Sequence, residues 1–181
     1  LTRRLTVLDR SMHDGVWNKS ADGAHEVRGR TLGIVGYGNI GTQLSVLAEN
    51  LGMSVVFYDT AEKLALGNAR RMDTLDELLE QADVVTLHVD GRQGNAGLFG
   101  AKQFARMRQG SIFLNLSRGF VVDYGALREA IVEGRVAGAA VDVFPKEPAS
   151  NSEPFVTPLQ GLPNVILTPH VGGSTEEAQE R

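Results

Sequence analysis

The sequence lacks cysteine, has no long apolar run and carries no excess of basic residues. Without cysteine, the chain can form neither disulfides nor thiolate metal sites. No apolar stretch approaches the roughly 20 residues that a membrane-spanning helix needs, and a net charge of -4 offers no basic field for nucleic acid. These absences predict a soluble, cytoplasmic protein without a membrane or nucleic-acid partner, and 181 residues suffice for one sizeable core.

Aromatic residues are also scarce, and the single tryptophan, Trp17, lies in the polar stretch 11–30. One interpretation is that Trp17 packs on its own domain. The other is that it anchors a partner subunit, because large aromatic side chains are favoured at interfaces. Just before it, helical spacing predicts a helix that ends at 13–15 and contains Leu1, Leu5, Leu8 and Met12.

The sequence is organised around residues 31–59, where an apolar run is followed by a glycine turn, an amphipathic segment and a second apolar run. The turn has the spacing G-x-G-x-x-G: Gly36 allows the tight turn, Gly38 lets the backbone approach a diphosphate, and Gly41 lets helix and strand pack closely. The phosphates would bind at the start of the helix, near Asn39 and Ile40. This strand, turn, helix and strand order predicts a dinucleotide-binding unit.

The acid that ends the second strand, Asp59, indicates which dinucleotide is bound. A carboxylate there accepts hydrogen bonds from the ribose hydroxyls of NAD and repels the additional phosphate of NADP. No arginine follows it directly. A role for Asp59 as a simple turn cap is disfavoured, because an unpaired charge at a buried strand end is costly. The predicted cofactor is therefore NAD.

The rest of the chain continues to alternate strands and helices. Helices are expected at 75–79 behind Thr74, at 101–107 and at 123–133 with Gly134 as C-cap, and strands at 82–89, 111–115, 136–143 and 164–167. Strands that are apolar on both faces and alternate with helices indicate an α/β fold with a doubly wound parallel sheet.

Polar residues that carry chemistry follow several of these strands. Arg118 follows strand 111–115, Asp142 and Glu147 follow the next, and His170 follows the last. Ligands of such sheets bind outside the carboxyl ends of the strands, so these side chains are expected on one rim. Each residue alone also fits an ordinary turn or surface role.

Together, these residue types suit hydride transfer from a hydroxyl-bearing carbon. Histidine titrates near neutrality, so His170 can take the hydroxyl proton, and Glu147 can hold its ring in one tautomer. Arg118 can bind a substrate carboxylate through two parallel hydrogen bonds. Asp142 can face the nicotinamide, and His88 is structural or a backbone neighbour of the cofactor. No pair of histidines or acids has metal-ligand spacing, so no metal is expected.

Long motifs resemble the D-isomer-specific 2-hydroxyacid dehydrogenases: GVWNK, LGIVGYGNIGTQL, NLSRGFVVD, AAVDVFPKEPASNSEPF and TPHVGGSTEEAQ. The resemblance implies a catalytic trio of Arg118, Glu147 and His170. It also implies NAD contacts, besides the glycine turn, from Asn39, Ile40, Asp59, Leu116, Ser117, Asp142, Val171, Gly172 and Gly173. We expect His88, Arg118 and His170 to contact the cofactor as well. One departure is Asp90, where the family usually has proline, and the contacts of residues 91–100 cannot be carried over.

The same resemblance implies an NAD-dependent enzyme that oxidises a D-2-hydroxy acid, 3-phosphoglycerate on the way to serine, and that forms a homodimer or a larger homo-oligomer. The alternatives are a glycerate or lactate dehydrogenase, or an NAD-sensing, corepressor-like interaction protein.

The implied organisation has three parts. Residues 1–30 form a linking helix and dimerisation segment, 31–173 the Rossmann NAD-binding domain, and 174–181 the start of a return helix, opened by a capping box from Ser174 to Glu177. The substrate domain is expected outside this chain, so the isolated chain is expected to bind NAD without useful turnover.

Overall fold

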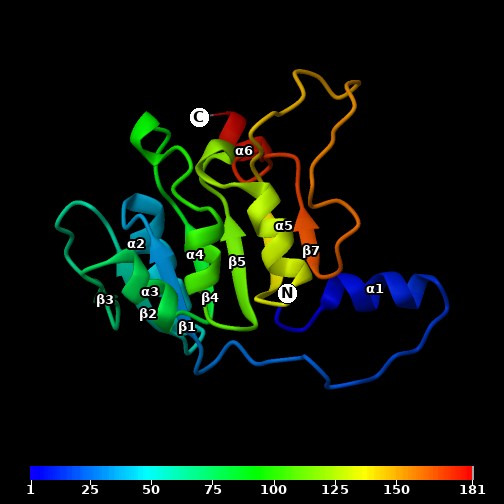
Figure 1. Ribbon diagram of the computed structural model, residues 1–181, viewed down its shortest axis with the longest axis horizontal. Coiled ribbons are helices and arrows are strands. Elements are labelled where there is room, and N and C mark those ends of the chain that lie inside the picture. The colour runs from blue at the N-terminus through cyan, green and yellow to red at the C-terminus, as the bar shows by residue number, and fades with distance from the viewer. Residues whose placement is uncertain (181) are drawn as a thin grey trace.

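Seven parallel strands form one sheet in the order β3-β2-β1-β4-β5-β6-β7 in the computed structural model, which describes residues 1–180 (Figure 1). Their bounds are β1 (Thr31–Val35), β2 (Ser54–Tyr58), β3 (Arg70–Arg71), β4 (Val84–Leu87), β5 (Ser111–Asn115), β6 (Val136–Val141) and β7 (Val165–Leu167). Because every pairing is parallel, all carboxyl ends lie on the same rim.

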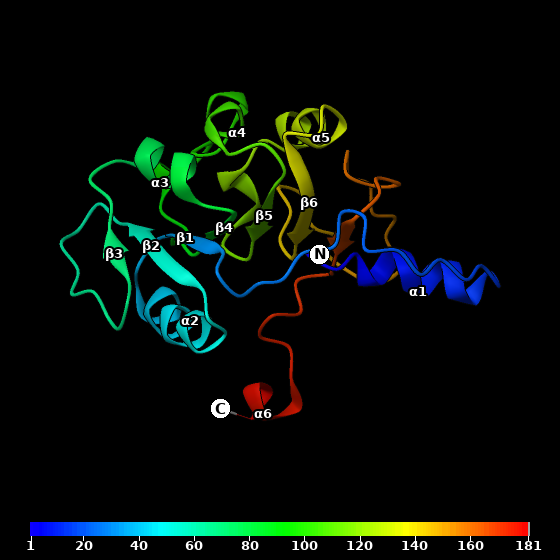
Figure 2. The same cartoon turned by 90° about the horizontal axis from the view of Figure 1, so that it is seen from below.

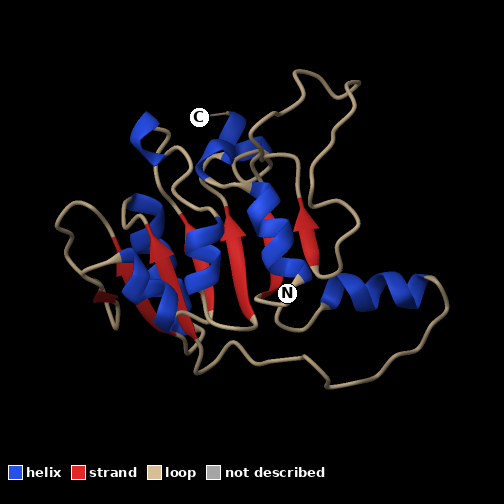
Figure 3. Ribbon diagram, viewed as in Figure 1, coloured by secondary structure: helices blue, strands red, loops and turns tan. Residues whose placement is uncertain are grey.

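Helices cover both faces of the sheet. They are α1 (Leu5–His13), α2 (Asn39–Asn50), α3 (Leu75–Gln81), α4 (Ala101–Arg106), α5 (Tyr124–Val132) and α6 (Glu176–Gln179), with 3-10 turns η1 (Gln93–Asn95) and η2 (Gly119–Val121). Figure 2 shows α3, α4 and α5 on one face and α2 on the other, and Figure 3 shows α1 lying beside the sheet. The predicted doubly wound α/β fold is confirmed. None of the helices in residues 1–180 is long and apolar enough to cross a membrane.

The larger core lies between the sheet and α3, α4 and α5. Three buried rings, Phe99, Phe104 and Phe113, pack against one another with centroids 5.1–5.6 Å apart. On the opposite face, Tyr37 stacks on Phe57 with a centroid distance of 3.7 Å. Burying both faces explains why the strands read as continuous apolar runs.

Helix α2 lies close to the sheet through small residues. It buries Gly41, Ser45 and Ala48. Leu47 and Leu51, whose spacing predicts the helix, are instead 62% and 60% exposed. A Cβ on Gly41 would stand 2.4 Å from the carbonyl oxygen of Gly36. The predicted close approach at Gly41 is therefore confirmed, and it fixes the start of α2 against the glycine turn.

Predicted helix ends agree with the structure where a side chain caps them. Thr74 accepts the backbone N–H of Glu77 at α3, Asp123 caps α5, and Gly134 follows α5 with φ +75°. The start of the chain differs: α1 begins at Leu5 because Arg4 has φ 52°, outside the helical region.

The predicted capping box is wrong by one residue. Thr175, not Ser174, is the N-cap of α6, and its hydroxyl accepts the N–H of Ala178. Residue 181 of the expected return helix lies outside the described residues. Strand β3 was not expected, because two charged arginines carry no strand pattern.

Candidate active site

The predicted site residues lie in the segments that leave the carboxyl ends of the strands. The glycine turn follows β1, Asp59 follows β2, and His88 follows β4. Leu116, Ser117 and Arg118 follow β5, Asp142 follows β6, and the loop that contains His170 follows β7. The parallel sheet therefore brings residues from distant parts of the sequence to one rim, as predicted.

The glycine turn leaves room for a diphosphate only at its middle glycine. Gly36 has φ +93°, and a Cβ there would stand 2.6 Å from the carbonyl oxygen of His88. At Gly38, by contrast, a Cβ would meet no atom within 4 Å. This open space lies at the N-terminus of α2, where the first backbone N–H groups have no helical partner. The turn therefore fits the diphosphate of a dinucleotide.

A hollow of about 310 Å³ adjoins this turn. It is lined by Tyr37, Gly38, Asn39, Thr42, Lys63, Leu64 and Leu66. Ile40, the next residue of α2, exposes 65% of its surface. The N-terminal turn of α2 is thus accessible to a ligand.

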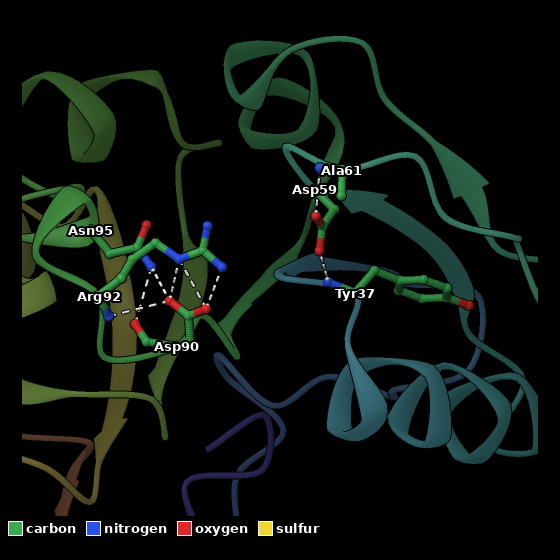
Figure 4. A network of polar contacts seen from close by, with 6 residues as sticks. All are labelled: Tyr37, Asp59, Ala61, Asp90, Arg92 and Asn95. Atoms are coloured by element: carbon green, nitrogen blue, oxygen red, sulfur yellow. Dashed lines mark hydrogen bonds and ion pairs between the residues drawn. The ribbon is translucent and has the colours of Figure 1, made fainter.

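Asp59 joins the end of β2 to the glycine turn (Figure 4). Its Oδ2 accepts the N–H of Tyr37 and its Oδ1 accepts the N–H of Ala61, each at 2.8 Å. Asp59 therefore does cap two backbone segments, and a role beyond capping stays a prediction. Each oxygen still has a second lone pair, so the same group can accept ribose hydroxyls.

His88 lies where β4 passes the glycine turn. Its Nε2 lies 2.9 Å from the hydroxyl of Thr86, and burial lowers the pKa of His88. The ring is therefore neutral at pH 7 and held by its own strand. Its backbone, which touches Gly36, is the part that borders the predicted cofactor site.

A buried network shapes the turn that carries Arg118. The side chain of Asn115 accepts the N–H and the hydroxyl of Ser117, and it donates to the carbonyl of Arg118 and to the hydroxyl of Tyr124. Tyr124 in turn donates to the carbonyl of Val143. Burial raises the pKa of Tyr124, so the hydroxyl stays protonated and keeps its donor. The exits of β5 and β6 are thereby linked.

Gly119 lets the segments that follow β5 and β6 pack closely against each other. A Cβ there would stand 1.9 Å from the carbonyl carbon of Phe144 and 2.4 Å from the nitrogen of Pro145, so only glycine fits. Next to it, the exposed guanidinium of Arg118 donates from Nη1 to the carbonyl of Ser117 at 2.7 Å. Leu116 is half exposed beside them.

Asp142 fixes the loop that carries His170. Its carboxylate accepts the hydroxyl of Thr168 at 2.6 Å and the N–H groups of Val171 and Gly172 at 2.9 Å each. Burial alone would raise the pKa of Asp142, but these three donors and the charge of protonated His170 hold the pKa below its ordinary value. The carboxylate is ionised and holds the loop on both sides of His170, through the side-chain hydroxyl of Thr168 before it and two backbone N–H groups after it. His170 itself has φ 56°.

Glu147 and His170 form the predicted pair. The Nδ1 of His170 lies 2.9 Å from Oε2 of Glu147, whose Oε1 accepts the N–H of Phe144 at 2.9 Å. Burial would raise the pKa of Glu147, but these hydrogen bonds and the positive charge of the imidazolium lower the pKa. The carboxylate thus fixes the tautomer, leaving Nε2 of the half-exposed ring for a substrate.

A cavity of about 440 Å³ opens beside this pair. It is lined by Phe144, Glu147, Pro148, Ser150, Asn151, Glu153, Phe155, Gln160, Leu167, Thr168, Pro169 and His170. Within residues 1–180, no group of three or more histidine, aspartate or glutamate side chains is arranged to hold a metal ion. The site therefore offers an acid–base pair at the mouth of a cavity.

The sequence reasoning missed three residues that build the site, Asn115, Tyr124 and Thr168. The sequence predicts Asn115 only as the last residue of strand 111–115, and Thr168 only follows the predicted strand 164–167. A buried amide or hydroxyl at a strand end requires partners, and that requirement is the signal that could have found them. Tyr124 carried no signal, because its partner at Val143 is set by the topology.

Comparison with known proteins gives this arrangement its family. Residues 1–172 match D-isomer specific 2-hydroxyacid dehydrogenase, NAD binding domain. The chain belongs to this family. Its predicted cofactor, NAD, and its predicted fold are those of the family domain. A curated relative, the D-3-phosphoglycerate dehydrogenase of Haemophilus influenzae (strain ATCC 51907 / DSM 11121 / KW20 / Rd), is 54% identical over 180 residues.

Solved structures of this family resemble this chain closely. D-lactate dehydrogenase with NAD+ from Lactobacillus jensenii superposes with a TM-score of 0.88 at 26% identity, covering 99% of this chain and 57% of that one. A D-isomer specific 2-hydroxyacid dehydrogenase from Xanthobacter autotrophicus Py2, in complex with NADPH and MES, gives 0.80 at 25% identity, covering 94% and 53%. The match with the Haemophilus enzyme covers 99% of this chain but 44% of the relative. The chain thus spans less than half the length of that relative.

Proposed function

We propose that this chain is the NAD-binding domain of an enzyme that oxidises D-3-phosphoglycerate to 3-phosphohydroxypyruvate, a step toward serine. Identity of 54% to a D-3-phosphoglycerate dehydrogenase supports the substrate. The observation that supports dehydrogenase chemistry is the 2.9 Å contact between His170 and Glu147 on the same rim as the glycine turn.

The catalytic base is His170. Its Nδ1 is engaged by Glu147, so Nε2 takes the hydroxyl proton of the substrate while the carboxylate stabilises the imidazolium that forms. NAD, when bound, would accept the hydride from the carbon that bears this hydroxyl group. Asp142 keeps the ring in place, because it binds the side-chain hydroxyl of Thr168 before His170 and the backbone N–H of Val171 after it.

Arg118 binds the carboxylate of the 2-hydroxy acid. The guanidinium is exposed on the rim, and its planar geometry suits two parallel hydrogen bonds to a carboxylate. The same cation polarises the developing carbonyl group. Gly119, packed on the backbone of Phe144, keeps the arginine turn beside the loop that carries Glu147.

The whole enzyme is proposed to be a cytoplasmic homodimer or a larger homo-oligomer that assembles through residues 1–30. Trp17 exposes 77% of its surface, so the interpretation that it packs on its own domain is wrong. The hypothesis that it anchors a partner subunit is favoured. Residues 31–173 bind NAD, and 174–181 begin the return to a substrate domain.

A chimaera tests this proposal. This chain would replace the matching 180 residues of the Haemophilus influenzae D-3-phosphoglycerate dehydrogenase, and NADH formation would be followed with 3-phosphoglycerate, D-glycerate and D-lactate. We expect turnover with 3-phosphoglycerate, lost in His170→Gln by about 100-fold or more while NADH binding persists.

Three results would contradict the proposal. Turnover of the His170→Gln chimaera at an unchanged rate would remove His170 from the chemistry. A chimaera that binds NADH but oxidises none of the three acids would instead favour an NAD-sensing interaction protein. Because 3-phosphoglycerate recognition in the chimaera comes partly from the relative, preference for D-glycerate or D-lactate would count directly against the proposed substrate.

A further inference from the structure

The segment that leaves β4 carries an ion pair that the proposed chemistry does not use. The Nε of Arg92 lies 2.8 and 2.9 Å from the two carboxylate oxygens of Asp90, and Nη2 also contacts Oδ2 (Figure 4). Asn95 donates its side-chain amide to Oδ1 of Asp90 at 2.9 Å. Both charged side chains are more than half exposed. Such a pair adds little to stability, so its position needs another explanation.

This segment borders the cofactor site at both of its ends. At its start, His88 and Val89 touch Gly36 so closely that a Cβ on Gly36 would collide with them. Next to Asp90, a Cβ on Gly91 would stand 3.4 Å from Nε of Arg118. The residues between therefore lie between the glycine turn and the proposed catalytic arginine, beside the proposed dinucleotide site.

The guanidinium of Arg92 lies within the electrostatic field of Asp59. Figure 4 shows the Asp90–Arg92 pair facing the end of β2 where Asp59 caps the glycine turn. The hydrogen bonds that Arg92 donates to Asp90 raise the pKa of Arg92 most, and the charge of Asp59 adds to this. Asp59 is proposed to accept a hydrogen bond from a ribose hydroxyl. A phosphate on that hydroxyl would therefore be attracted by the charge of Arg92.

The charge of Arg92 works against the cofactor preference that Asp59 sets. Asp59 repels a 2′-phosphate, whereas an unpaired arginine at this place attracts one, because its planar fork suits phosphate. Asp90 occupies that fork with both oxygens. The same fold accommodates either cofactor, since a solved relative holds NADPH.

We propose that Asp90 is a cofactor-selecting residue: by occupying and neutralising the guanidinium of Arg92, it prevents that cation from binding the 2′-phosphate of NADP(H). The selectivity for NAD(H) then rests on two carboxylates: Asp59, which repels the 2′-phosphate, and Asp90, which neutralises Arg92. The inference rests on the cofactor site of the proposed function, not on its reaction or substrate.

Calorimetric titration of the 181-residue chain with NADH and with NADPH tests this inference. The measured quantity is the ratio of the Kd for NADPH to the Kd for NADH. Asp90→Ala frees Arg92, so we expect the ratio to fall by about fivefold or more at low salt. Asp90→Asn, which keeps the shape and one acceptor, should lower it in the same direction. Adding Arg92→Ala to Asp90→Ala should return the ratio to that of the unchanged chain.

Glu133→Gln is the matched control. Glu133 is an exposed acid that follows α5 just before the start of β6, at the rim opposite the carboxyl ends of the strands, and its loss changes the net charge equally. We expect this variant to leave the ratio of the two Kd values unchanged. Salt at about 0.5 M should reduce the effect of Asp90→Ala on that ratio, because it screens the charge of Arg92.

Three outcomes would overturn the inference. The ratio could stay unchanged in both Asp90 variants, or the gain could persist without Arg92. In either case NADH binding by the unchanged chain leaves the proposed function intact. If the unchanged chain bound neither nucleotide, the cofactor site itself would fail, and this inference with it.

Discussion

Replacing Asp142 by asparagine should loosen the loop that carries His170. The carboxylate accepts three hydrogen bonds, from the hydroxyl of Thr168 and from the N–H groups of Val171 and Gly172. Asparagine keeps one oxygen toward the first two donors but turns an NH2 group toward the N–H of Gly172. One charge-assisted bond then becomes a contact between two donors, and the other two lose the charge.

The size of this effect follows from the hydrogen bonds. Each bond to a charged group contributes about 1.5–3 kcal/mol. Losing one outright and weakening two predicts a decrease of about 2–4 kcal/mol in the free energy of unfolding, unless the loop detaches before the domain unfolds. Thr168→Val removes one of the three bonds and leaves the other two and the charge in place, so it should cost about 1.5–3 kcal/mol.

Urea unfolding at pH 7, together with amide hydrogen exchange at Val171 and Gly172, measures both routes. Asp142→Asn should lower the global stability or increase exchange at these two amides, and Thr168→Val should do so less. Asp123→Asn is a suitable control, because it alters an aspartate that caps α5 and touches neither the loop nor His170.

The effect should also depend on pH in a defined direction. The folded-state pKa of Asp142 is lowered, so its contribution is fully present above the ordinary carboxyl range and is lost as pH falls through the folded-state pKa. The difference between the unchanged chain and Asp142→Asn should narrow below roughly pH 4. A difference that is absent at pH 7 in both assays, or that stays constant into acid, would refute this reasoning.

Three other substitutions test separate parts of the structure. Gly119→Ala should lower the free energy of unfolding by at least about 3 kcal/mol, because its Cβ overlaps the backbone of Phe144, whereas Gly100→Ala, which meets no atom within 4 Å, should cost less than about 1 kcal/mol in the same urea assay. Tyr124→Phe should lower the free energy of unfolding by about 1–3 kcal/mol, because it leaves the carbonyl of Val143 unpaired. A melting temperature equal to that of the unchanged chain would contradict a stabilising role for this hydrogen bond. Trp17→Ala should shift sedimentation of the assembled protein toward smaller species, and an unchanged sedimentation coefficient would end the anchor hypothesis.

Local patterns predicted most of the fold because the central strands are buried on both faces. Runs such as Val55–Tyr58 and the caps at Thr74 and Asp123 carry their own structural signal. The failures came from places where local signals are weak. The two arginines of β3 join the sheet through backbone pairing alone, and two adjacent hydroxyl residues made the N-cap of α6 ambiguous.

The rule that strands of a parallel sheet end on one rim predicts that His170 lies near Glu147, and the 2.9 Å contact between the two side chains confirms it. The contacts that hold the site were not predictable in the same way. Asp142 clamping the His170 loop and Gly119 touching Phe144 depend on how two strand exits approach each other. Sequence spacing does not encode that approach.

The most direct test of the account is a calorimetric titration of NADH into this chain and into Gly38→Val. A side chain at Gly38 enters open space, so the variant should fold with a stability within about 1 kcal/mol of the unchanged chain. The account predicts that the unchanged chain binds NADH and that Gly38→Val, though folded, binds it at least about tenfold more weakly, because the valine fills the space of the diphosphate. Equal binding by the two proteins would show that the dinucleotide does not lie on the glycine turn, and would contradict the account.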